Sequence, residues 1–281
     1  MVSLKNQNLG RLKMNSFIGW VGGKRLLRKT IIALMPEHKT YVEVFGGGGW
    51  VLFGKDQSDV EVYNDFNPEL VNLFRTVRDR LPDFKTRLIF LLSSREEYVR
   101  FQRIARTGGE FKSEVDRAIA FYYLIRNSFG SGILTGWGFS PSQPPRPLMT
   151  KDLETAADRL RNVYIDNLSF ERLITNWDRK ETLFYCDPPY RMLLDKKGRS
   201  YYQCTFSLED HTRLRDVLRG VAGRVIISYD DHPEVRELYK GFNITETKPV
   251  LYTMNRRPGA AERRVSELII TNFEVKNRLK S

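Results

Sequence analysis

Four consecutive glycines, Gly46 to Gly49, directly follow a short apolar segment, Tyr41 to Phe45. The apolar segment is predicted to be a buried strand, which the glycines end sharply. Glycine adopts positive φ angles and lets a ligand approach the backbone closely, as in the strand-to-helix turns of nucleotide-binding proteins. A flexible turn without a ligand is the other interpretation. No Gly-Lys-Ser/Thr triplet follows the glycines, so we expect no P-loop.

Strand-like and helix-like patterns alternate in the first and last parts of the chain. Near the start, one amphipathic helix is expected to end before Pro36, and another to begin at Pro68 with Asn67 as its cap. Further strands are expected over residues 60–63, 163–165, 182–186 and 224–228, with a helix over 208–218 and a closing strand pair over 242–250 and 267–271. This alternation is typical of doubly wound α/β proteins, here with a mostly parallel sheet and an antiparallel closing strand.

The middle of the chain has a different pattern. Helical spacing is expected over residues 88–92, 98–104 and 115–125, without a convincing strand between them, and a Gly-, Pro- and Ser-rich loop follows over 129–149. So long an irregular stretch in a compact domain is usually functional or disordered. We therefore predict a division of the chain into a flexible arm over 1–15, one α/β core formed by 16–78 and 156–281, and a helical insert over 79–155.

The chain is strongly basic. Its 281 residues include 46 Lys and Arg against 34 Asp and Glu, a formal net charge of +12. A polyanion is therefore the expected partner, and nucleic acid is favoured over a membrane because no apolar run approaches the roughly 20 residues of a spanning helix. Two cysteines, Cys186 and Cys204, are too few for a disulfide framework or a zinc cluster. We expect a cytoplasmic protein without a structural metal.

An acidic residue, Asp65, follows the second predicted strand. A carboxylate at this place, after a strand that succeeds a glycine-rich turn, can accept hydrogen bonds from the two hydroxyls of a ribose. Capping of the helix that begins near Asn67 is an equally good interpretation.

The tetrapeptide Asp187-Pro188-Pro189-Tyr190 directly follows another apolar strand. Its two prolines stiffen the backbone and remove two N–H donors, which leaves carbonyl groups, one carboxylate and an aromatic ring. This set suits a planar ligand with an exocyclic amine, because the carboxylate and a carbonyl each accept one N–H while the ring stacks on Tyr190. A rigid turn rarely needs this combination, so the tetrapeptide is a strong indication of chemistry.

These features, together with Gly19-Trp20-Val21-Gly22-Gly23-Lys24, resemble the Dam-type (alpha-group) DNA adenine N6-methyltransferases. Trp20 to Lys24 is similar to the N-terminal cofactor motif of that family, Phe45 to Gly49 to its S-adenosylmethionine loop, and Asp187 to Tyr190 to its catalytic tetrapeptide. The resemblance runs from about residue 17 to residue 273, and it includes Ser266-Glu267-Leu268 near the end as well as the order of the motifs. It implies a Rossmann-like S-adenosylmethionine-dependent methyltransferase core with the helical insert as a DNA target-recognition domain.

The resemblance also implies a reaction, the transfer of a methyl group from S-adenosylmethionine to the amino group of a flipped-out adenine. The Asp187 carboxylate and the Pro188 carbonyl would each accept one amino hydrogen, which shifts electron density toward the nitrogen, and Tyr190 would stack on the base. The residues expected to contact the cofactor are Trp20, Lys24, Phe45, Gly46, Gly48, Asp65, Phe170 and Asp187. Phe170 is equally well interpreted as a core residue, and no metal is implied.

Double-stranded DNA is the implied partner, and a companion restriction endonuclease outside any stable complex is left open. The residues expected to contact DNA are Arg126, Asn127, Arg146, Lys197, Arg199, Arg256 and Arg257, although each arginine taken singly is better interpreted as a solvated charge. After the last insert helix the chain departs from the Arg- and Asn-bearing hairpin of the family, so no target sequence is carried over. The alternatives are an RNA adenine methyltransferase and a non-catalytic nucleic-acid-binding relative.

Overall fold

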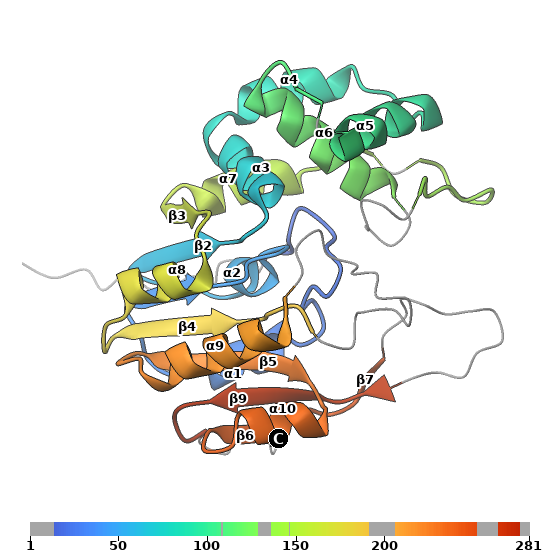
Figure 1. Ribbon diagram of the computed structural model, residues 1–281. Coiled ribbons are helices and arrows are strands. Elements are labelled where there is room, and N and C mark those ends of the chain that lie inside the picture. Colours follow the sequence, from blue (N-terminus) through green and yellow to red (C-terminus); the bar gives the residue numbers. More distant parts are fainter. Residues whose placement is uncertain are drawn as a thin grey trace, which may run out of the picture.

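The computed structural model describes residues 14–107, 109–128, 136–145, 147–190, 206–251 and 264–275. Nearly all of the arm predicted over residues 1–15 therefore lies outside the described residues. The described chain forms a sheet with helices on both faces and a group of helices beyond one edge of the sheet (Figure 1). None of its helices is both long and apolar enough to cross a membrane.

The main sheet has seven strands in the order β3-β2-β1-β4-β5-β9-β6. Their bounds are β1 Thr40–Glu43, β2 Val60–Asn64, β3 Val163–Asp166, β4 Thr182–Cys186, β5 Arg224–Asp230, β6 Asn243–Glu246 and β9 Glu267–Thr271. Neighbouring strands pair in parallel, except that β9 runs antiparallel to both β5 and β6. A separate ribbon is formed by β7 (Val250–Leu251) and β8 (Arg264–Val265). The predicted mostly parallel sheet with an antiparallel closing strand is confirmed.

Two sets of helices cover the two faces of this sheet (Figure 1). One face carries α1 (Arg28–Leu34), α2 (Trp50–Gly54) and α3 (Pro68–Asp79), and the other carries α8 (Phe170–Trp177), α9 (Leu208–Arg219) and α10 (Pro233–Leu238). Successive side chains of a strand point to opposite faces. Tyr185 therefore packs with the first set of helices, and Phe184 packs with the second. Burial on both faces explains why the residues of β4 that follow Thr182 are all apolar or aromatic.

The start of α3 has the predicted cap. The side-chain oxygen of Asn67 accepts hydrogen bonds from the N–H groups of Glu69, at 2.9 Å, and Leu70, at 3.4 Å, and Pro68 occupies the first helical position. These contacts satisfy N–H groups that have no partner inside the helix. They fix the path of the chain directly after Asp65, the acidic residue at the end of β2.

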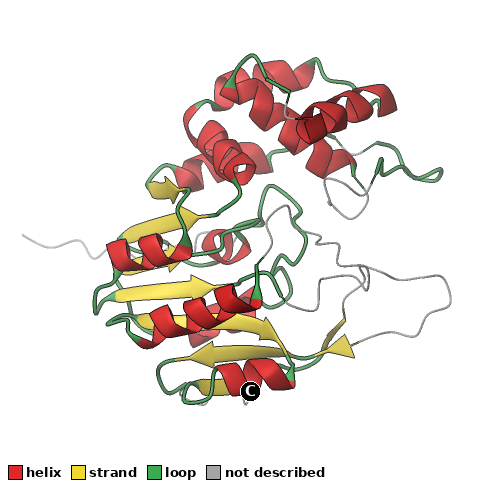
Figure 2. Ribbon diagram, viewed as in Figure 1, coloured by secondary structure: helices red, strands yellow, loops and turns green. Residues whose placement is uncertain are grey.

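Between β2 and β3 the chain forms only helices within its described part, and these gather beyond the β3 edge of the sheet (Figure 2). After α3 they are α4 (Leu81–Ile89), α5 (Arg95–Thr107), α6 (Glu114–Asn127) and α7 (Asp152–Leu160). The helix expected over 88–92 instead occupies 81–89, because it starts at the Leu81-Pro82 pair and the apolar residues that follow it, Phe90 and Leu92, are exposed. The assignment of 79–155 as a separate domain stays a prediction.

The order of the strands reverses beside β1. The chain builds outward from β1 to β2 and β3, and then returns to place β4 on the other side of β1. In open α/β sheets, ligands bind outside the carboxyl ends of the strands at such a reversal. The residues after β1 and β4 are the glycines and the Asp187 tetrapeptide, so the fold brings the two strongest sequence features to one place.

Candidate active site

The glycines after β1 form a tight turn that leads into α2. Gly47 and Gly49 have φ angles of 48° and 66°, which lie in the left-handed region that favours glycine. The Gly46 N–H donates to the carbonyl of Asn64 at 2.7 Å, and the Gly49 N–H donates to the carbonyl of Gly46 at 2.7 Å. Tyr63 donates its hydroxyl to the Gly47 carbonyl at 2.8 Å. The turn is therefore held firmly by the end of β2.

Asp65 joins this turn to the start of α3. One carboxylate oxygen accepts the Gly47 N–H at 2.8 Å, and the other accepts the Asn67 N–H at 2.8 Å. Burial raises the pKa of Asp65, and the two backbone donors partly offset that shift. A carboxylate has about four acceptor positions, so each oxygen keeps the capacity for a further hydrogen bond.

The N-terminal motif packs on top of the glycine turn. A Cβ added to Gly47 would lie 2.8 Å from Cδ1 of Trp20, which places the indole directly against the backbone of the turn. Ser16 donates its hydroxyl to the Gly48 carbonyl at 2.5 Å. On its other side Trp20 meets the ring of Phe121 in α6, with 6.1 Å between centroids. The segment around Trp20 thus contacts both the turn and the helical region.

Lys24 links the N-terminal motif to the tetrapeptide. Its buried ammonium nitrogen lies 2.8 Å from Oδ1 of Asp187 and 3.9 Å from Oε2 of Glu267, and it sits over the ring of Tyr190, 4.6 Å from the centroid. The ammonium also donates to the Gly22 carbonyl at 3.0 Å. Residues far apart in the sequence therefore converge on one cation at the carboxyl end of β4.

The Asp187 carboxylate is held from a second direction. Ser228, on β5, donates its hydroxyl to Oδ1 of Asp187 at 2.9 Å, and the Tyr185 hydroxyl lies 2.9 Å from Oγ of Ser228. Lys24 contacts the same oxygen. Both partners that the described residues supply to this carboxylate therefore reach Oδ1, and Oδ2 keeps acceptor capacity for another donor.

Tyr190 is held by two neighbouring strands. Its hydroxyl donates to Oε2 of Glu267 at 2.8 Å, and its ring stacks on Tyr229 with a centroid distance of 5.7 Å and an interplanar angle of 24°. Burial raises the pKa of Tyr190 well above its ordinary value, and the negative charges of Asp187 and Glu267 add to that rise. Tyr190 therefore keeps its proton and remains a donor.

Sequence reasoning did not identify Glu267 or Ser228 as site residues. Glu267 opens the last strand and pairs with Asp230 across β5 and β9, a register that no local pattern reveals. The only signal for Glu267 was its position in the Ser266-Glu267-Leu268 segment that resembles the family.

Glu43, another buried carboxyl group, lies at the end of β1 under the glycine turn. It accepts hydrogen bonds from the Tyr41 hydroxyl, at 2.9 Å, and from the Leu52 N–H, at 2.8 Å. Burial raises the pKa of Glu43 to about 8, against the lowering effect of these two donors. The carboxyl group is therefore largely protonated at neutral pH.

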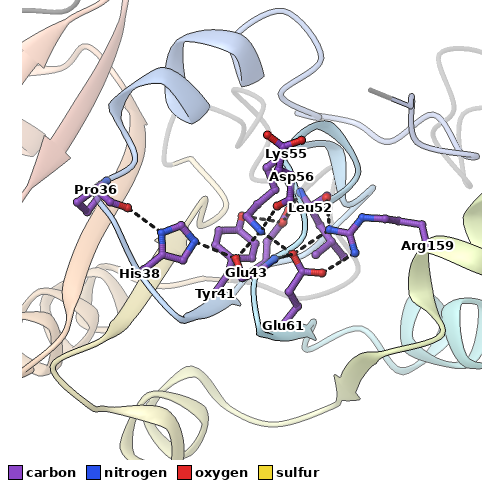
Figure 3. A network of polar contacts seen from close by, with 10 residues as sticks. Pro36, His38, Tyr41, Glu43, Leu52, Lys55, Asp56, Glu61 and Arg159 are labelled. Carbon is purple, nitrogen blue, oxygen red and sulfur yellow. Dashed lines mark hydrogen bonds and ion pairs between the residues drawn. The ribbon is translucent and has the colours of Figure 1, made fainter. Parts of the chain in front are cut away.

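A buried ion cluster lies next to Glu43 (Figure 3). Lys55 lies 2.5 Å from Oε1 of Glu61, and Arg159 donates to both oxygens of Glu61, at 2.5 and 2.8 Å. Lys55 also sits over the ring of Tyr41, 4.5 Å from its centroid. Because Arg159 belongs to α7, this cluster ties the last helix before β3 to the base of the glycine turn.

Phe45 and Phe170 form an aromatic group near the same edge of the sheet. Their centroids are 6.0 Å apart, and Phe206 lies within 5.8 Å of both rings. Phe45 is partly exposed, whereas Phe170 is 7% exposed at the first position of α8. Contact with a cofactor stays a prediction for both residues.

Two of the residues predicted to contact DNA lie in the described chain, at the end of α6. Arg126 donates to the Pro147 carbonyl at 2.7 Å. Asn127 is buried, and its side-chain amide donates to the Tyr123 carbonyl of its own helix at 3.0 Å. The predicted contacts of both with DNA remain untested. The other predicted residues, Arg146, Lys197, Arg199, Arg256 and Arg257, lie outside the described residues.

Comparison with known families shows to which class of enzyme this chain belongs. The family model described as D12 class N6 adenine-specific DNA methyltransferase matches residues 20–253. The chain belongs to this family. The match includes the glycine turn, the tetrapeptide and the helices between them, so this D12 class protein is an enzyme, an adenine-specific DNA methyltransferase. Membership in a methyltransferase family implies S-adenosylmethionine as the methyl donor.

Curated relatives of this D12 class enzyme align with it over most of their lengths. A Type II methyltransferase of Lactococcus lactis subsp. cremoris is 31% identical, with 94% of this chain and 97% of the relative aligned. A DNA adenine methylase of Vibrio cholerae is 27% identical, over 92% of this chain and 95% of the relative. A DNA adenine methylase of Escherichia coli K12 is 25% identical, over 81% and 85%. Among the described residues, no three His, Cys, Asp or Glu side chains gather as a metal site would require.

Proposed function

We propose that this enzyme methylates a flipped-out adenine in double-stranded DNA, with Asp187, Pro188 and Tyr190 holding the base. The observation that carries the proposal is the 2.8 Å contact between Lys24 and Asp187, which joins the N-terminal motif to the tetrapeptide beside the glycine turn. This is the point at which the strand order reverses. Base, cofactor and catalytic carboxylate would therefore meet at one edge of the sheet.

On the base side, Asp187 and Pro188 supply the acceptors. Oδ2 of Asp187 would accept a hydrogen bond from one N–H of the adenine amino group, and the Pro188 carbonyl would accept one from the other N–H. These bonds draw electron density toward the nitrogen and orient it for attack. The nitrogen becomes acidic once methylated, so Asp187 has to hold a hydrogen bond rather than act as a strong base. Tyr190, fixed by Glu267 and Tyr229, would provide the stacking surface.

On the cofactor side, the residues present suit S-adenosylmethionine. Asp65 has acceptor capacity for ribose hydroxyls, and the next residue, Phe66, offers an apolar surface that is 62% exposed. Trp20, Lys24, Phe45, Gly46, Gly48, Asp65, Phe170 and Asp187 would line the site. When bound, the cofactor supplies a methyl group on a positively charged sulfur, and the carboxylates of Asp187 and Glu267 favour a cation there.

The helices between β2 and β3 are proposed to recognise the target sequence. They contact the catalytic region through Trp20 and Phe121 and through the Arg159–Glu61 ion pair. Extrusion of a base from the duplex costs a few kcal/mol, which contacts to phosphates can offset. The net charge of +12 is consistent with such contacts. A companion endonuclease and a cytoplasmic location stay predictions.

The test replaces Asp187 and follows three quantities separately. In Asp187→Ala, transfer of a labelled methyl group to duplex DNA should fall by about 100-fold or more, because the amine loses its principal acceptor. Binding of duplex DNA, measured by fluorescence anisotropy, should change little. Single-stranded DNA and RNA serve as parallel substrates, and the proposal requires duplex DNA to be the best of the three.

The matched control is Asp158→Asn, at an exposed carboxylate in α7 that pairs with Arg161 in the described chain. Removal of the Asp187 charge takes an ion-pair partner away from the buried Lys24, which can destabilise the fold. The unfolding temperatures of both variants are therefore compared, and Asp187→Asn is added as a variant of similar volume. Turnover near the wild-type rate in Asp187→Ala would refute the role of this carboxylate. Preferential methylation of RNA would refute the proposed substrate.

A further inference from the structure

The Asp187 carboxylate is the end of a chain of hydroxyl groups that crosses two strands. The β4–β5 register pairs Cys186 with Ile227, so Asp187 and Ser228 are the next neighbours along the two strands. Tyr185 lies two residues before Asp187 and therefore on the same face of the sheet. The distances are 2.9 Å from Ser228 to Asp187 and 2.9 Å from Tyr185 to Ser228.

The direction of these hydrogen bonds follows from counting protons. An ionised carboxylate paired with Lys24 can only accept, so Ser228 donates its single proton to Asp187. The remaining lone pairs of Ser228 then accept the proton of Tyr185. Burial raises the pKa of Tyr185 well above its ordinary value, which keeps this proton in place. The hydroxyl groups of Ser228 and Tyr185 therefore each donate to one defined acceptor.

We propose that Ser228 and Tyr185 are positioning residues that fix Oδ1 of Asp187, so that Oδ2 is presented to the adenine amino group. The inference rests on the proposed role of Asp187. Lys24 contacts the same oxygen but stands on a long side chain with four rotatable bonds, and it is also assigned to the cofactor. Ser228 and Tyr185, in contrast, are fully buried on adjacent strands, at 0% and 1% exposure. They form the rigid support of the carboxylate.

The experiment compares Ser228→Ala, Tyr185→Phe and the double variant in the full-length enzyme, with kcat and KM measured for duplex DNA and for S-adenosylmethionine. Ser228→Ala should lower kcat about tenfold, equivalent to about 1.4 kcal/mol, with both KM values within about twofold of wild type. Tyr185→Phe should have a smaller effect on kcat. Because Tyr185 acts only through Ser228, the double variant should be no slower than Ser228→Ala.

The double variant also separates positioning from stability. In Ser228→Ala a buried hydroxyl, that of Tyr185, loses its acceptor, so the unfolding temperature should fall; removal of both hydroxyls should restore most of it. A low kcat that persists in the double variant supports the positioning of Asp187 by the hydrogen bonds from Tyr185 to Ser228 and from Ser228 to Asp187, here called the relay. Recovery of kcat together with the unfolding temperature would overturn it, because a merely structural pair behaves that way.

A matched control is Tyr122→Phe, which removes another fully buried tyrosine hydroxyl, one that donates to the Leu148 carbonyl far from Asp187. This control should lose stability and keep its kcat. Wild-type kcat in Ser228→Ala, while Asp187→Ala is inactive, would overturn the relay alone. Retained turnover in Asp187→Ala would overturn the role of Asp187 and the relay together.

Discussion

Substitution of Gly46 by alanine tests how tightly the glycine turn is built. A Cβ at Gly46 would lie 2.2 Å from Cε2 of Tyr63 and 2.7 Å from Cδ2 and Cζ of the same ring. The ring has no room to move, because it is fully buried and stacks on Phe74 with 4.1 Å between centroids. Its hydroxyl is also bound to the Gly47 carbonyl at 2.8 Å. Either the core or the turn must therefore shift.

The cost can be estimated from these contacts. Overpacking of a filled core costs about 1–3 kcal/mol, and the strained Tyr63–Gly47 hydrogen bond adds about 1 kcal/mol. We expect Gly46→Ala to lower the free energy of unfolding by about 2–4 kcal/mol, which corresponds to a fall of roughly 3–7 °C in Tm for a chain of this size. A shift of the turn would also move the Gly47 N–H away from Asp65. Affinity for S-adenosylmethionine should therefore fall as well.

The assays are thermal unfolding by calorimetry and isothermal titration with S-adenosylmethionine. The matched control is Gly220→Ala at the end of α9, where φ is −92° and the nearest atom to the added Cβ, the Val217 carbonyl oxygen, is 3.6 Å away. That variant should be neutral or more stable by up to about 1 kcal/mol. If Gly46→Ala matches Gly220→Ala in both Tm and cofactor affinity, the reasoning about the turn is wrong.

Two further predictions concern the buried carboxyl groups. Between its ordinary pKa of 4.5 and its folded-state pKa of about 8, Glu43 holds a proton in the folded chain but not in the unfolded chain. The free energy of unfolding should therefore fall as pH rises through this window, by on the order of 5 kcal/mol. Denaturant unfolding of wild type and Glu43→Gln at pH 5 and pH 8 should show a smaller fall in the variant, and equal falls would count against the shifted pKa. Glu267→Ala should reduce methyl transfer more than Glu267→Gln, because only the glutamine retains an acceptor for the Tyr190 hydroxyl. Equal kcat values for these two variants would show that this hydrogen bond does not position Tyr190.

Most elements of the sheet could be predicted because they depend on short-range patterns. β4 and β5 each contain a run of consecutive apolar residues, Leu183 to Cys186 and Val225 to Ile227, and α3 carries its cap and its proline in adjacent positions. α2, by contrast, was missed because five residues are too few for a helical period to be visible. α8 was missed although Ser169 caps it and its apolar residues recur at helical spacing, so a signal for that helix was present.

The candidate site was predictable only in part. The glycine turn, Asp65 and the tetrapeptide can be recognised by residue type and by their places after strands, because positive φ angles and acceptor groups need particular residues. Asn127 illustrates the limit, since its side-chain amide donates to the Tyr123 carbonyl of its own helix in the described chain, a contact that the sequence did not predict. Whether a polar side chain points outward depends on its neighbours in space.

By itself, then, the sequence determined the α/β class, the order of the motifs and the place of the Asp187 tetrapeptide after an apolar strand, since each depends on residues within a few positions of one another. Only the tertiary structure decided that Lys24, Ser228 and Glu267 surround that tetrapeptide. Strand order and register bring these residues together across long stretches of chain, and register is set by the packing of whole strands and helices against one another.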